Sequence, residues 1–293
     1  MALGERTVLA GGFGYLEAAR WHRQALWFSD FKYQKVHRMT ADGRYVTVAE
    51  VPTTPSGLGF APDDSLLIVS LSDGHLLRLA PGSREPVDIA DLNQVGFHPN
   101  DMAVDGEGRA YITHFGYDWF NGDEPRPTGV IIRHPDGRQE LAGGGLQFPN
   151  GVAISPDGKR LYVAESFATP NTRLTAFDIV EGGGLARQRT ITQFGPAGTH
   201  IADGICVDLE DGVWVAVCQQ GEFRRVLPDG TVTDTVRIPA AEGNYVVDSA
   251  LGGPDGRTLF MLIADATVER IRDNFQTTAR VEAVRVDIPG PLD

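Results

Sequence analysis

The sequence lacks several features that would indicate a membrane, a secretory route or a polyanionic partner. No apolar run approaches the length of a bilayer span, and residues 1–6 contain no apolar core of a signal peptide. Basic residues are too few for a nucleic-acid or anionic-membrane surface, because 26 Lys and Arg stand against 39 Asp and Glu. We therefore expect a cytoplasmic protein with neither a nucleic-acid nor a membrane partner.

Cysteines are scarce and long helices are missing. The two cysteines, Cys206 and Cys218, have no metal-ligand spacing, and we expect them to be reduced, packed thiols. No segment has the pattern of a helix of three turns, and no linker or low-complexity run divides the chain. Glycine and proline are abundant, with 35 and 18 residues, which is typical of many turns between short strands.

Six copies of a strand–turn–strand pattern follow one another along the chain. Residues 148–166 show it most clearly, because the turn residues Pro156-Asp157-Gly158 separate two short apolar strands. Each copy places a large apolar residue at the same point of its second strand. These matched residues are Trp27, Leu67, Tyr111, Tyr162, Trp214 and Phe260. Third and fourth strands are predicted after most copies, for example at 173–177 and 190–194.

This repeat predicts an all-β fold, a six-bladed β-propeller with about four antiparallel strands per blade. We expect it to form a single domain over residues 1–293, in which radial repetition leaves few exposed strand edges. Residues 279–288 alternate apolar and polar side chains and are interpreted as a closing strand. Residues 5–10 are the candidate strand that completes the same blade.

One position of the repeat carries oxygen-bearing side chains. Counting back from each matched apolar residue to the start of its first strand gives Glu17, Gly57, Asn100, Asn150, Asp203 and Ser249. The first strand of a blade is normally innermost, so these residues should face one another at one end of the central channel. Two carboxylates would then crowd together with two amides, and without a counter-charge the carboxylates would repel each other.

An all-oxygen donor set of this kind predicts a divalent metal site formed by Glu17, Asn100, Asn150 and Asp203. Hard cations prefer such donors, so Ca²⁺ is expected first and Mg²⁺ or Mn²⁺ are alternatives. The lack of nitrogen and sulfur donors argues against a structural zinc. The competing interpretation is that the Asn-Gly and Asp-Gly pairs are turn residues at strand starts.

The ordered set of motifs resembles the SMP-30/gluconolactonase/LRE family of six-bladed propellers over nearly the whole chain. The matching stretches are Leu-Glu-Ala-Ala-Arg-Trp-His at 16–22, Asn-Asp-Met-Ala-Val-Asp at 100–105, Pro-Asn-Gly-Val-Ala-Ile-Ser-Pro-Asp-Gly at 149–158, Ala-Asp-Gly-Ile-Cys-Val-Asp at 202–208, and Leu-Gly-Gly-Pro-Asp-Gly-Arg-Thr-Leu-Phe at 251–260. The resemblance implies a divalent metal, usually calcium but sometimes zinc or manganese. It implies Glu17, Asn150 and Asp203 as ligands, with Asn100 close by.

The resemblance also implies hydrolysis of lactones or, in some members, of phosphotriesters. In a lactone hydrolase the metal would polarise the ester carbonyl, and Asp203 is the candidate general base for the attacking water. A nucleophilic role for Asp203 is the alternative. Competing hypotheses are a phosphotriesterase or other esterase at the same site, and a non-catalytic ligand-binding propeller with a structural metal.

The chain departs from the family pattern at two places. Ala18 and Ala19 replace the usual Gly-Pro after Glu17, which keeps the ligand. His98 stands where sugar lactonases often carry an Arg that can bind a hydroxylated or anionic substrate bidentately. This departure favours a more apolar lactone over a plain sugar lactone, and both stay within the predicted substrate class.

The substrate partner is expected to be a small lactone or related ester with some apolar character, because aromatic residues gather around the candidate site. The candidate substrate-binding residues are His98, Asn100, His114, Tyr117, Trp119, Phe148, Phe167 and His200. The sequence shows no obvious interface stripe, and the oligomeric state is left open.

Overall fold

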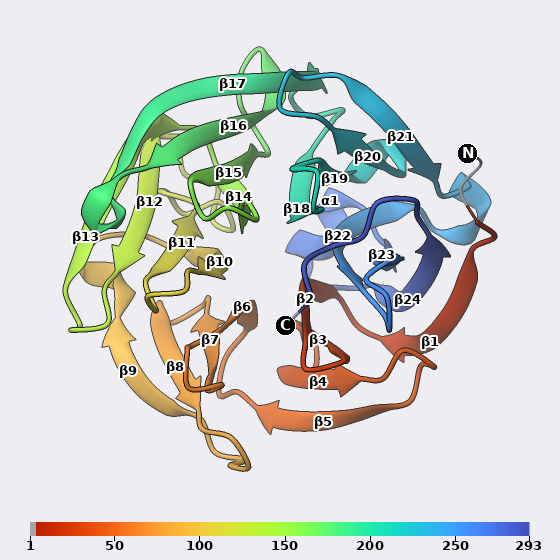
Figure 1. Cartoon of the computed structure of the whole chain (residues 1–293), viewed down its shortest axis with the longest axis horizontal. Helices are drawn as coiled ribbons and strands as arrows, with labels where there is room; N and C mark the ends of the chain where they lie inside the picture. The colour runs from red at the N-terminus through yellow and green to blue at the C-terminus, as the bar shows by residue number, and fades with distance from the viewer. Residues whose placement is uncertain (1–3, 293) are drawn as a thin grey trace.

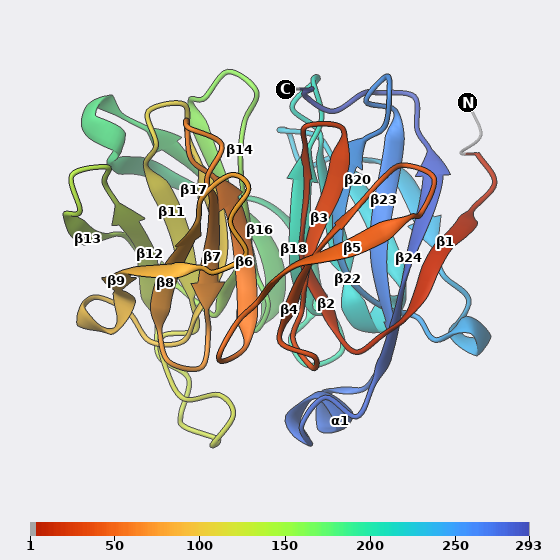
Figure 2. The same ribbon diagram turned by 90° about the horizontal axis from the view of Figure 1, so that it is seen from below.

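The computed structural model describes residues 4–292, apart from the side chain of Glu242. Six four-stranded antiparallel sheets stand around a central axis like the blades of a propeller (Figure 1). The predicted all-β six-bladed β-propeller is therefore confirmed. Its outline is seen from the side in Figure 2, where the strands run between two opposite faces of the molecule.

The first five blades are each formed by four consecutive strands. Blade 1 contains β2 (Leu16–His22), β3 (Ala25–Asp30), β4 (Lys35–Met39) and β5 (Tyr45–Glu50), and blade 2 contains β6 (Pro55–Phe60), β7 (Leu66–Ser70), β8 (His75–Leu79) and β9 (Val87–Asp91). Blade 3 contains β10 (Pro99–Val104), β11 (Ala110–His114), β12 (Thr128–Arg133) and β13 (Gln139–Leu146), and blade 4 contains β14 (Pro149–Ile154), β15 (Arg160–Glu165), β16 (Asn171–Ile179) and β17 (Leu185–Pro196). Blade 5 contains β18 (Ala202–Val207), β19 (Val213–Val217), β20 (Glu222–Val226) and β21 (Val232–Arg237).

The sixth blade joins the two ends of the chain. β22 (Tyr245–Gly252), β23 (Thr258–Asp265) and β24 (Thr278–Arg285) are completed by the N-terminal strand β1 (Thr7–Phe13), which pairs antiparallel with β24. The predicted closure is confirmed, with the N-terminal strand a few residues later than expected. Pairing of the two ends closes the ring, so that no blade is left half-built.

The hydrophobic core lies between neighbouring blades rather than in one central mass. Tyr162 of β15 and Val215 of β19, for example, belong to one buried cluster shared by blades 4 and 5. Trp21 of β2 stacks on Phe260 of β23 with ring centroids 5.1 Å apart, and so joins the first blade to the last. The matched apolar residues of the repeat thus act as spacers between blades.

Two elements were missed by the sequence analysis. β13 contains Gly143, Gly144 and Gly145 among polar residues, so its apolar alternation is too weak to be recognised. α1 (Val268–Arg272) is a helix of only five residues, capped by Thr267, whose side chain accepts a hydrogen bond from the Arg270 amide. No helix within residues 4–292 is long and apolar enough to cross a bilayer.

Each blade has an irregularity near the start of its first strand. The ladder between the first and second strands shifts register there in all six blades. A bulge of this kind changes the direction in which a side chain points. In blades 1, 3, 4 and 5 the predicted oxygen donor lies three residues before the strand partner of the matched apolar residue.

The equivalent positions in the other two blades correct the sequence prediction. Register places Ser56 of β6 and Val247 of β22 at the position of Glu17, so the predicted Gly57 and Ser249 are wrong by one and two residues. Counting back along the chain fails because the paired positions of the first two strands are seven residues apart in blade 1 (Arg20 and Trp27), eight in blade 2 (Gly59 and Leu67) and ten in blade 6 (Ala250 and Phe260).

Candidate active site

The four predicted oxygen donors line one cavity. Glu17, Asn100, Asn150 and Asp203 come from the innermost strands β2, β10, β14 and β18 and border a small space of about 60 Å³. Residues of α1 also line this space. It therefore lies at the end of the channel that carries α1, at the bottom of Figure 2.

The glycines that follow two of these donors are not turn residues. Gly151 and Gly204 lie inside strands and do not have positive φ angles. A Cβ atom on Gly151 would collide with the backbone oxygen of Asp203, and one on Gly204 would collide with the carboxylate of Asp248. Glycine is needed here because innermost strands of neighbouring blades approach closely, so the turn interpretation of the Asn-Gly and Asp-Gly pairs is wrong.

A chain of hydrogen bonds around the axis fixes the two amides. Ser56 Oγ donates to Asn100 Oδ1 at 3.0 Å, and Asn100 Nδ2 donates to Asn150 Oδ1 at 2.5 Å. Asn150 Nδ2 then donates to Ser166 Oγ at 3.0 Å, whose hydroxyl donates to Ala202 O at 2.7 Å. Each amide oxygen has a second lone pair, so both can still serve as ligands. The sequence analysis missed Ser56 and Ser166.

Asp203 is buried, with one of its two oxygens unpaired. The Cys218 thiol donates to Asp203 Oδ2 at 3.1 Å, whereas Oδ1 has no hydrogen-bond partner. Burial raises the pKa of Asp203 to about 7, although the hydrogen bond from Cys218 lowers it. Burial, followed by the charge of Asp203, also raises the pKa of Glu17. An unpaired buried carboxylate oxygen beside a second carboxylate is the environment that a cation would stabilise.

The chemistry of the four donors is consistent with a hard cation. No group of three or more His, Cys, Asp or Glu side chains in residues 4–292 is arranged to hold a metal by itself. The cavity floor instead combines two carboxylates, from Glu17 and Asp203, with the amide oxygens of Asn100 and Asn150. Oxygen-only donors with two negative charges fit Ca²⁺ or Mg²⁺, with water or substrate completing the shell.

Aromatic side chains cover the space above the four donors. Phe148 stacks on Phe115 at 4.1 Å and meets Phe167 edge-on at 4.7 Å, and Trp119 stacks on Phe167 at 6.2 Å. Phe148 has a left-handed backbone with φ of 53°, which is an outlier for a bulky residue. Phe120 also lines the space. The predicted aromatic surroundings are thus present.

Half of the candidate substrate-binding residues border the cavity and half do not. Asn100, Trp119, Phe148 and Phe167 line it, whereas His98, His114, Tyr117 and His200 are not among the lining residues. Tyr117 is buried against Phe148. His98 lies behind Phe115 and Phe120, with ring centroids 6.0 and 5.6 Å away. His200 Nδ1 lies 3.0 Å from Thr199 Oγ1.

His114 lies at the start of the aromatic loop, residues 116–127, which carries Trp119 and Phe120. Its Nδ1 accepts a hydrogen bond from the Phe97 amide at 3.1 Å, so the ring proton lies on Nε2, which is 2.8 Å from Thr128 Oγ1. Burial lowers the pKa of His114 to about 4, so the ring is neutral at physiological pH. His114 thus ties together the two ends of the loop 116–127.

A second part of the cavity wall comes from blade 6 and was missed. Val268, Ile271 and Phe275, in and after α1, line the cavity opposite the aromatic loop. The Arg272 guanidinium lies 4.2 Å from the Trp119 ring centroid, and its Nη2 donates to Trp119 O at 3.3 Å. The loop and the α1 segment therefore meet over the site. A five-residue helix gives too little periodicity to be recognised from sequence.

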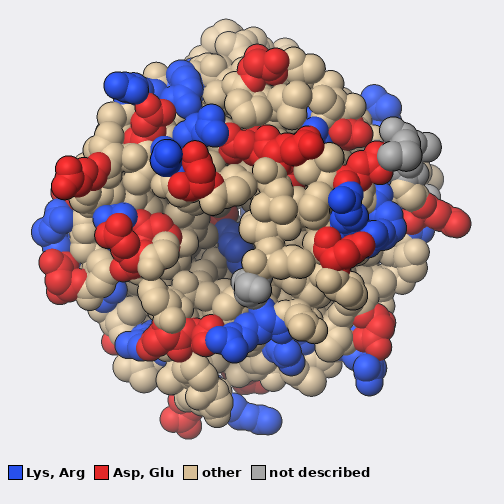
Figure 3. All heavy atoms as spheres, in the orientation of Figure 1, with Lys and Arg blue, Asp and Glu red and all other residues tan. Residues whose placement is uncertain are grey.

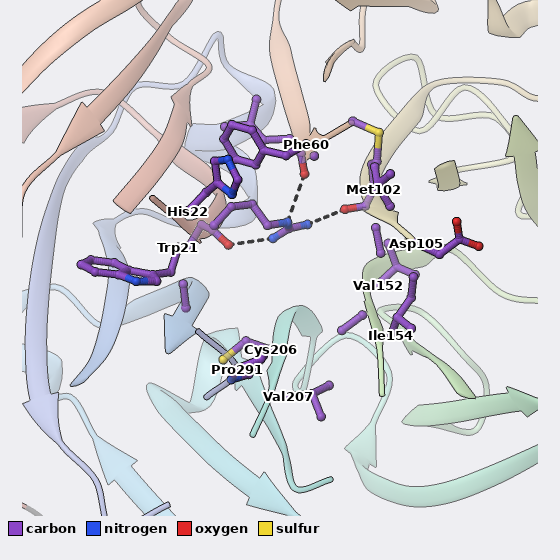
Figure 4. A pocket seen from close by; sticks show the side chains of 18 of the residues that line it. Trp21, His22, Phe60, Met102, Asp105, Val152, Ile154, Cys206, Val207 and Pro291 are labelled. Carbon is purple, nitrogen blue, oxygen red and sulfur yellow. Dashed lines mark hydrogen bonds between the residues drawn. The ribbon is translucent and has the colours of Figure 1, made fainter. Parts of the chain in front are cut away.

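The opposite mouth of the channel is a separate, open pocket of about 520 Å³. It is the hollow at the centre of the face in Figure 3, and Figure 4 shows its apolar lining, including Phe60, Met102 and Val152. Arg20 also lines it, and its guanidinium lies between the buried carboxylates Asp101 and Asp248. This cluster separates the open pocket from the cavity at the other end.

Comparison with known proteins shows the family of this chain. The sequence profile described as SMP-30/Gluconolactonase/LRE-like region matches residues 16–265, which include all four oxygen donors. The chain belongs to the SMP-30/gluconolactonase/LRE-like family. Among curated members, it is 26% identical to 6-deoxy-6-sulfogluconolactonase of Pseudomonas putida, over 91% of this chain and 89% of that protein. It is 29% identical to L-arabinolactonase of Azospirillum brasilense, over 82% and 79% of the two chains.

Solved structures of this family share the fold. A calcium-binding protein, regucalcin, from Agrobacterium tumefaciens superposes with a TM-score of 0.79 and 19% identity, over 99% of this chain and 96% of that chain. A gluconolactonase from Xanthomonas campestris gives a TM-score of 0.75 with 20% identity, over 98% and 90%. At these identities the likeness concerns the six-bladed architecture alone.

Proposed function

We propose that this family member is a metal-dependent hydrolase that opens a small lactone. The observation that carries the proposal is the convergence of Glu17, Asn100, Asn150 and Asp203 on one cavity, with Asp203 Oδ1 buried and unpaired. Relatives named lactonases over most of the chain support this reaction class. Glu17, Asn150 and Asp203 would hold the metal, with Asn100 beside them, and Ca²⁺ is the first choice because of the oxygen-only donors.

The bound ion would act as a Lewis acid that stabilises negative charge on the ester carbonyl oxygen. In the proposed reaction, Asp203 takes a proton from the attacking water at its unpaired Oδ1. Cys218 holds the other oxygen, so that the carboxylate keeps one orientation. The aromatic cover limits bulk water, which strengthens electrostatic interactions inside the cavity.

A hydrolysis screen tests the proposed reaction. We expect the purified full-length protein to release a hydroxy acid from at least one lactone in a panel that spans sugar and alkyl lactones, measured by proton release. Phosphotriesters and simple aryl esters belong in the same panel, because the same donors could act on them. Turnover of phosphotriesters without any lactone turnover would replace the proposal by the phosphotriesterase alternative.

The thiol of Cys218 is expected to position Asp203. Cys218→Ala removes the hydrogen bond from the thiol to Asp203 Oδ2, and should lower kcat by roughly tenfold, as the loss of a net 1–1.5 kcal/mol would. Cys218→Ser keeps a donor and should restore most of the rate. Cys206→Ser is the matched control, because Cys206 lines the opposite mouth of the channel. Equal rates for Cys218→Ala and wild type would exclude this positioning role.

A further inference from the structure

The wall of the cavity above its polar floor is almost entirely hydrocarbon. Phe31, Phe115, Phe120, Phe148, Phe167, Ile201, Val268, Ile271 and Phe275 line it together with the indole of Trp119. No Lys, Arg or His side chain is among the lining residues in the part of the chain that the structure describes. Tyr15, Tyr245 and Ser166 also line the cavity. Burial, with nearby charges that include Glu17 and Asp203, raises the pKa of both tyrosines, and Ser166 accepts a hydrogen bond from Asn150, so these hydroxyls lie with the polar floor. A ligand in this space therefore meets polar groups at one end, where the four oxygen donors and these hydroxyls lie.

The groups that could bind extra hydroxyls or a negative charge face away from the cavity. The His98 ring lies behind Phe115 and Phe120, and its Nε2 lies 3.5 Å from Asp118 Oδ1. The guanidinium of Arg272 lies over the Trp119 ring and bonds to the Trp119 backbone, outside the lining. Hydroxyls under the aromatic cover would lose water without gaining partners, and an anionic substituent there would meet no Lys, Arg or His side chain among the lining residues.

We infer that the site takes an uncharged lactone that carries an alkyl or aryl substituent, with the lactone ring at the polar floor and the substituent under the aromatic cover. This inference rests on the proposed lactonase function and specifies its substrate class. Trp119, Phe148 and Phe167 are the residues that select the substituent, because they form the stacked face of the cover.

Entry of such a substrate requires the cover to open. The space of about 60 Å³ holds a few water molecules, whereas ligand pockets are roughly 300–1,000 Å³. Two segments form the outer part of the cover, 116–127 from blade 3 and 266–277 from blade 6, and they meet through Arg272 and Trp119. Both protrude from the same face of the propeller, at the bottom of Figure 2. Their separation would expose the hydrocarbon wall to a substrate.

The test is a homologous series of γ-lactones that carry unbranched alkyl chains of increasing length, beside a polyhydroxylated lactone of similar size. We expect kcat/KM to rise by about fourfold for each added methylene until the pocket is full. The polyhydroxylated lactone should be turned over roughly 100-fold less efficiently than an alkyl lactone of similar size. Preference for the polyhydroxylated lactone, or no dependence on alkyl length, would overturn the substrate class while the lactonase proposal stands.

Variants connect the selectivity to the cover. Trp119→Ala should raise KM for the long-chain lactones about tenfold more than it raises KM for the unsubstituted lactone, because only the substituent contacts the indole. Phe167→Ala serves as a second variant of the same face. Leu209 is an exposed apolar residue in the β18–β19 turn. Leu209→Ala is the matched control and should change KM for neither kind of lactone. If each of Trp119→Ala and Phe167→Ala changed KM by the same factor for substituted and unsubstituted lactones, these residues would not select the substituent. If no lactone of either kind is hydrolysed by metal-loaded protein, the proposed function itself fails.

Discussion

Asp203→Asn should lower kcat for lactone hydrolysis by roughly 10²–10⁴-fold, which is the range expected when a general base is lost. Asparagine keeps the shape of the side chain and one carbonyl oxygen as a donor, but it cannot accept the proton of the attacking water. Because Asp203 is 4% exposed, the isosteric change avoids the cavity that alanine would leave. Initial-rate kinetics and thermal unfolding of the same preparation measure both effects.

Two controls separate catalysis from binding and folding. Asp123→Asn removes an exposed carboxylate from the loop on the same face and should leave the rate unchanged. Asp203→Asn should retain bound metal in part, as measured by metal analysis, while activity is lost. An Asp203→Asn protein that is folded and fully active would exclude the proposed role. A wild-type protein that binds lactones without turning them over would instead favour the non-catalytic propeller.

Arg20→Met should destabilise the protein by about 3–5 kcal/mol, because it leaves two buried carboxylates without their counter-charge. The Arg20 guanidinium donates to Asp101 Oδ1 and lies 3.6 Å from Asp248 Oδ2, and the Asp248 side chain is only 1% exposed. Arg20 also donates to the backbone oxygens of Leu58, Ala19 and Met102, at 3.1, 2.8 and 2.8 Å, two of which belong to other blades. We expect a fall in Tm on the order of 10 °C.

The loss of folding stability in Arg20→Met should depend on pH. Burial raises the pKa of both Asp101 and Asp248, and the charge of Arg20 opposes the increase. Without Arg20 the folded-state pKa values rise further above the unfolded values. In Arg20→Met, ionisation of the two buried carboxylates destabilises the folded protein most above their folded-state pKa values. This destabilisation disappears as pH falls below their unfolded-state pKa values. The difference in unfolding free energy from wild type should therefore shrink as pH falls through the folded-state pKa values towards the unfolded ones.

Arg285→Met is the matched control for this prediction. Arg285 forms an exposed ion pair with Asp255, with side-chain exposures of 54% and 50%, and such pairs contribute about 1 kcal/mol or less. Denaturant unfolding of the three proteins across the pH range gives the comparison. A Tm of Arg20→Met equal to that of wild type at about pH 8 would show that the carboxylates are stabilised in another way.

Much of the fold could be predicted from sequence because the repeat is regular. In each blade, the matched residue of the second strand packs in the same place. Tyr162 and its equivalents fill the space between blades, and their large apolar side chains are recognisable in each copy. Asn150 could be linked with Glu17 and Asp203 for the same reason, since one place in the repeat lies on the innermost strand. β13 was missed because it is a glycine-rich edge strand whose sequence lacks a clear alternation of apolar and polar residues.

The parts of the site that could not be predicted depend on register and on contacts between distant segments. Ser56 was missed because a count of ten residues, which is correct for blade 1, leads back from Leu67 to Gly57, whereas the paired positions of blade 2 are one residue further apart than those of blade 1. The contact between Arg272 and Trp119 joins residues from blades 6 and 3, and nothing local in either segment specifies it. His114 has the residue type of a pocket ligand, yet its two ring nitrogens are occupied by Phe97 and Thr128.

The most direct test of the central claim combines metal analysis with lactone hydrolysis on one preparation of the full-length protein. We predict about one divalent ion per chain, as one site of this donor set would hold, lost together with activity on chelation. Calcium should restore both, and Glu17→Gln should weaken metal binding measured by calorimetry, because one of the two ligand charges is removed. Lactone hydrolysis at the full rate in metal-free protein, or no cation binding to wild type, would contradict the account.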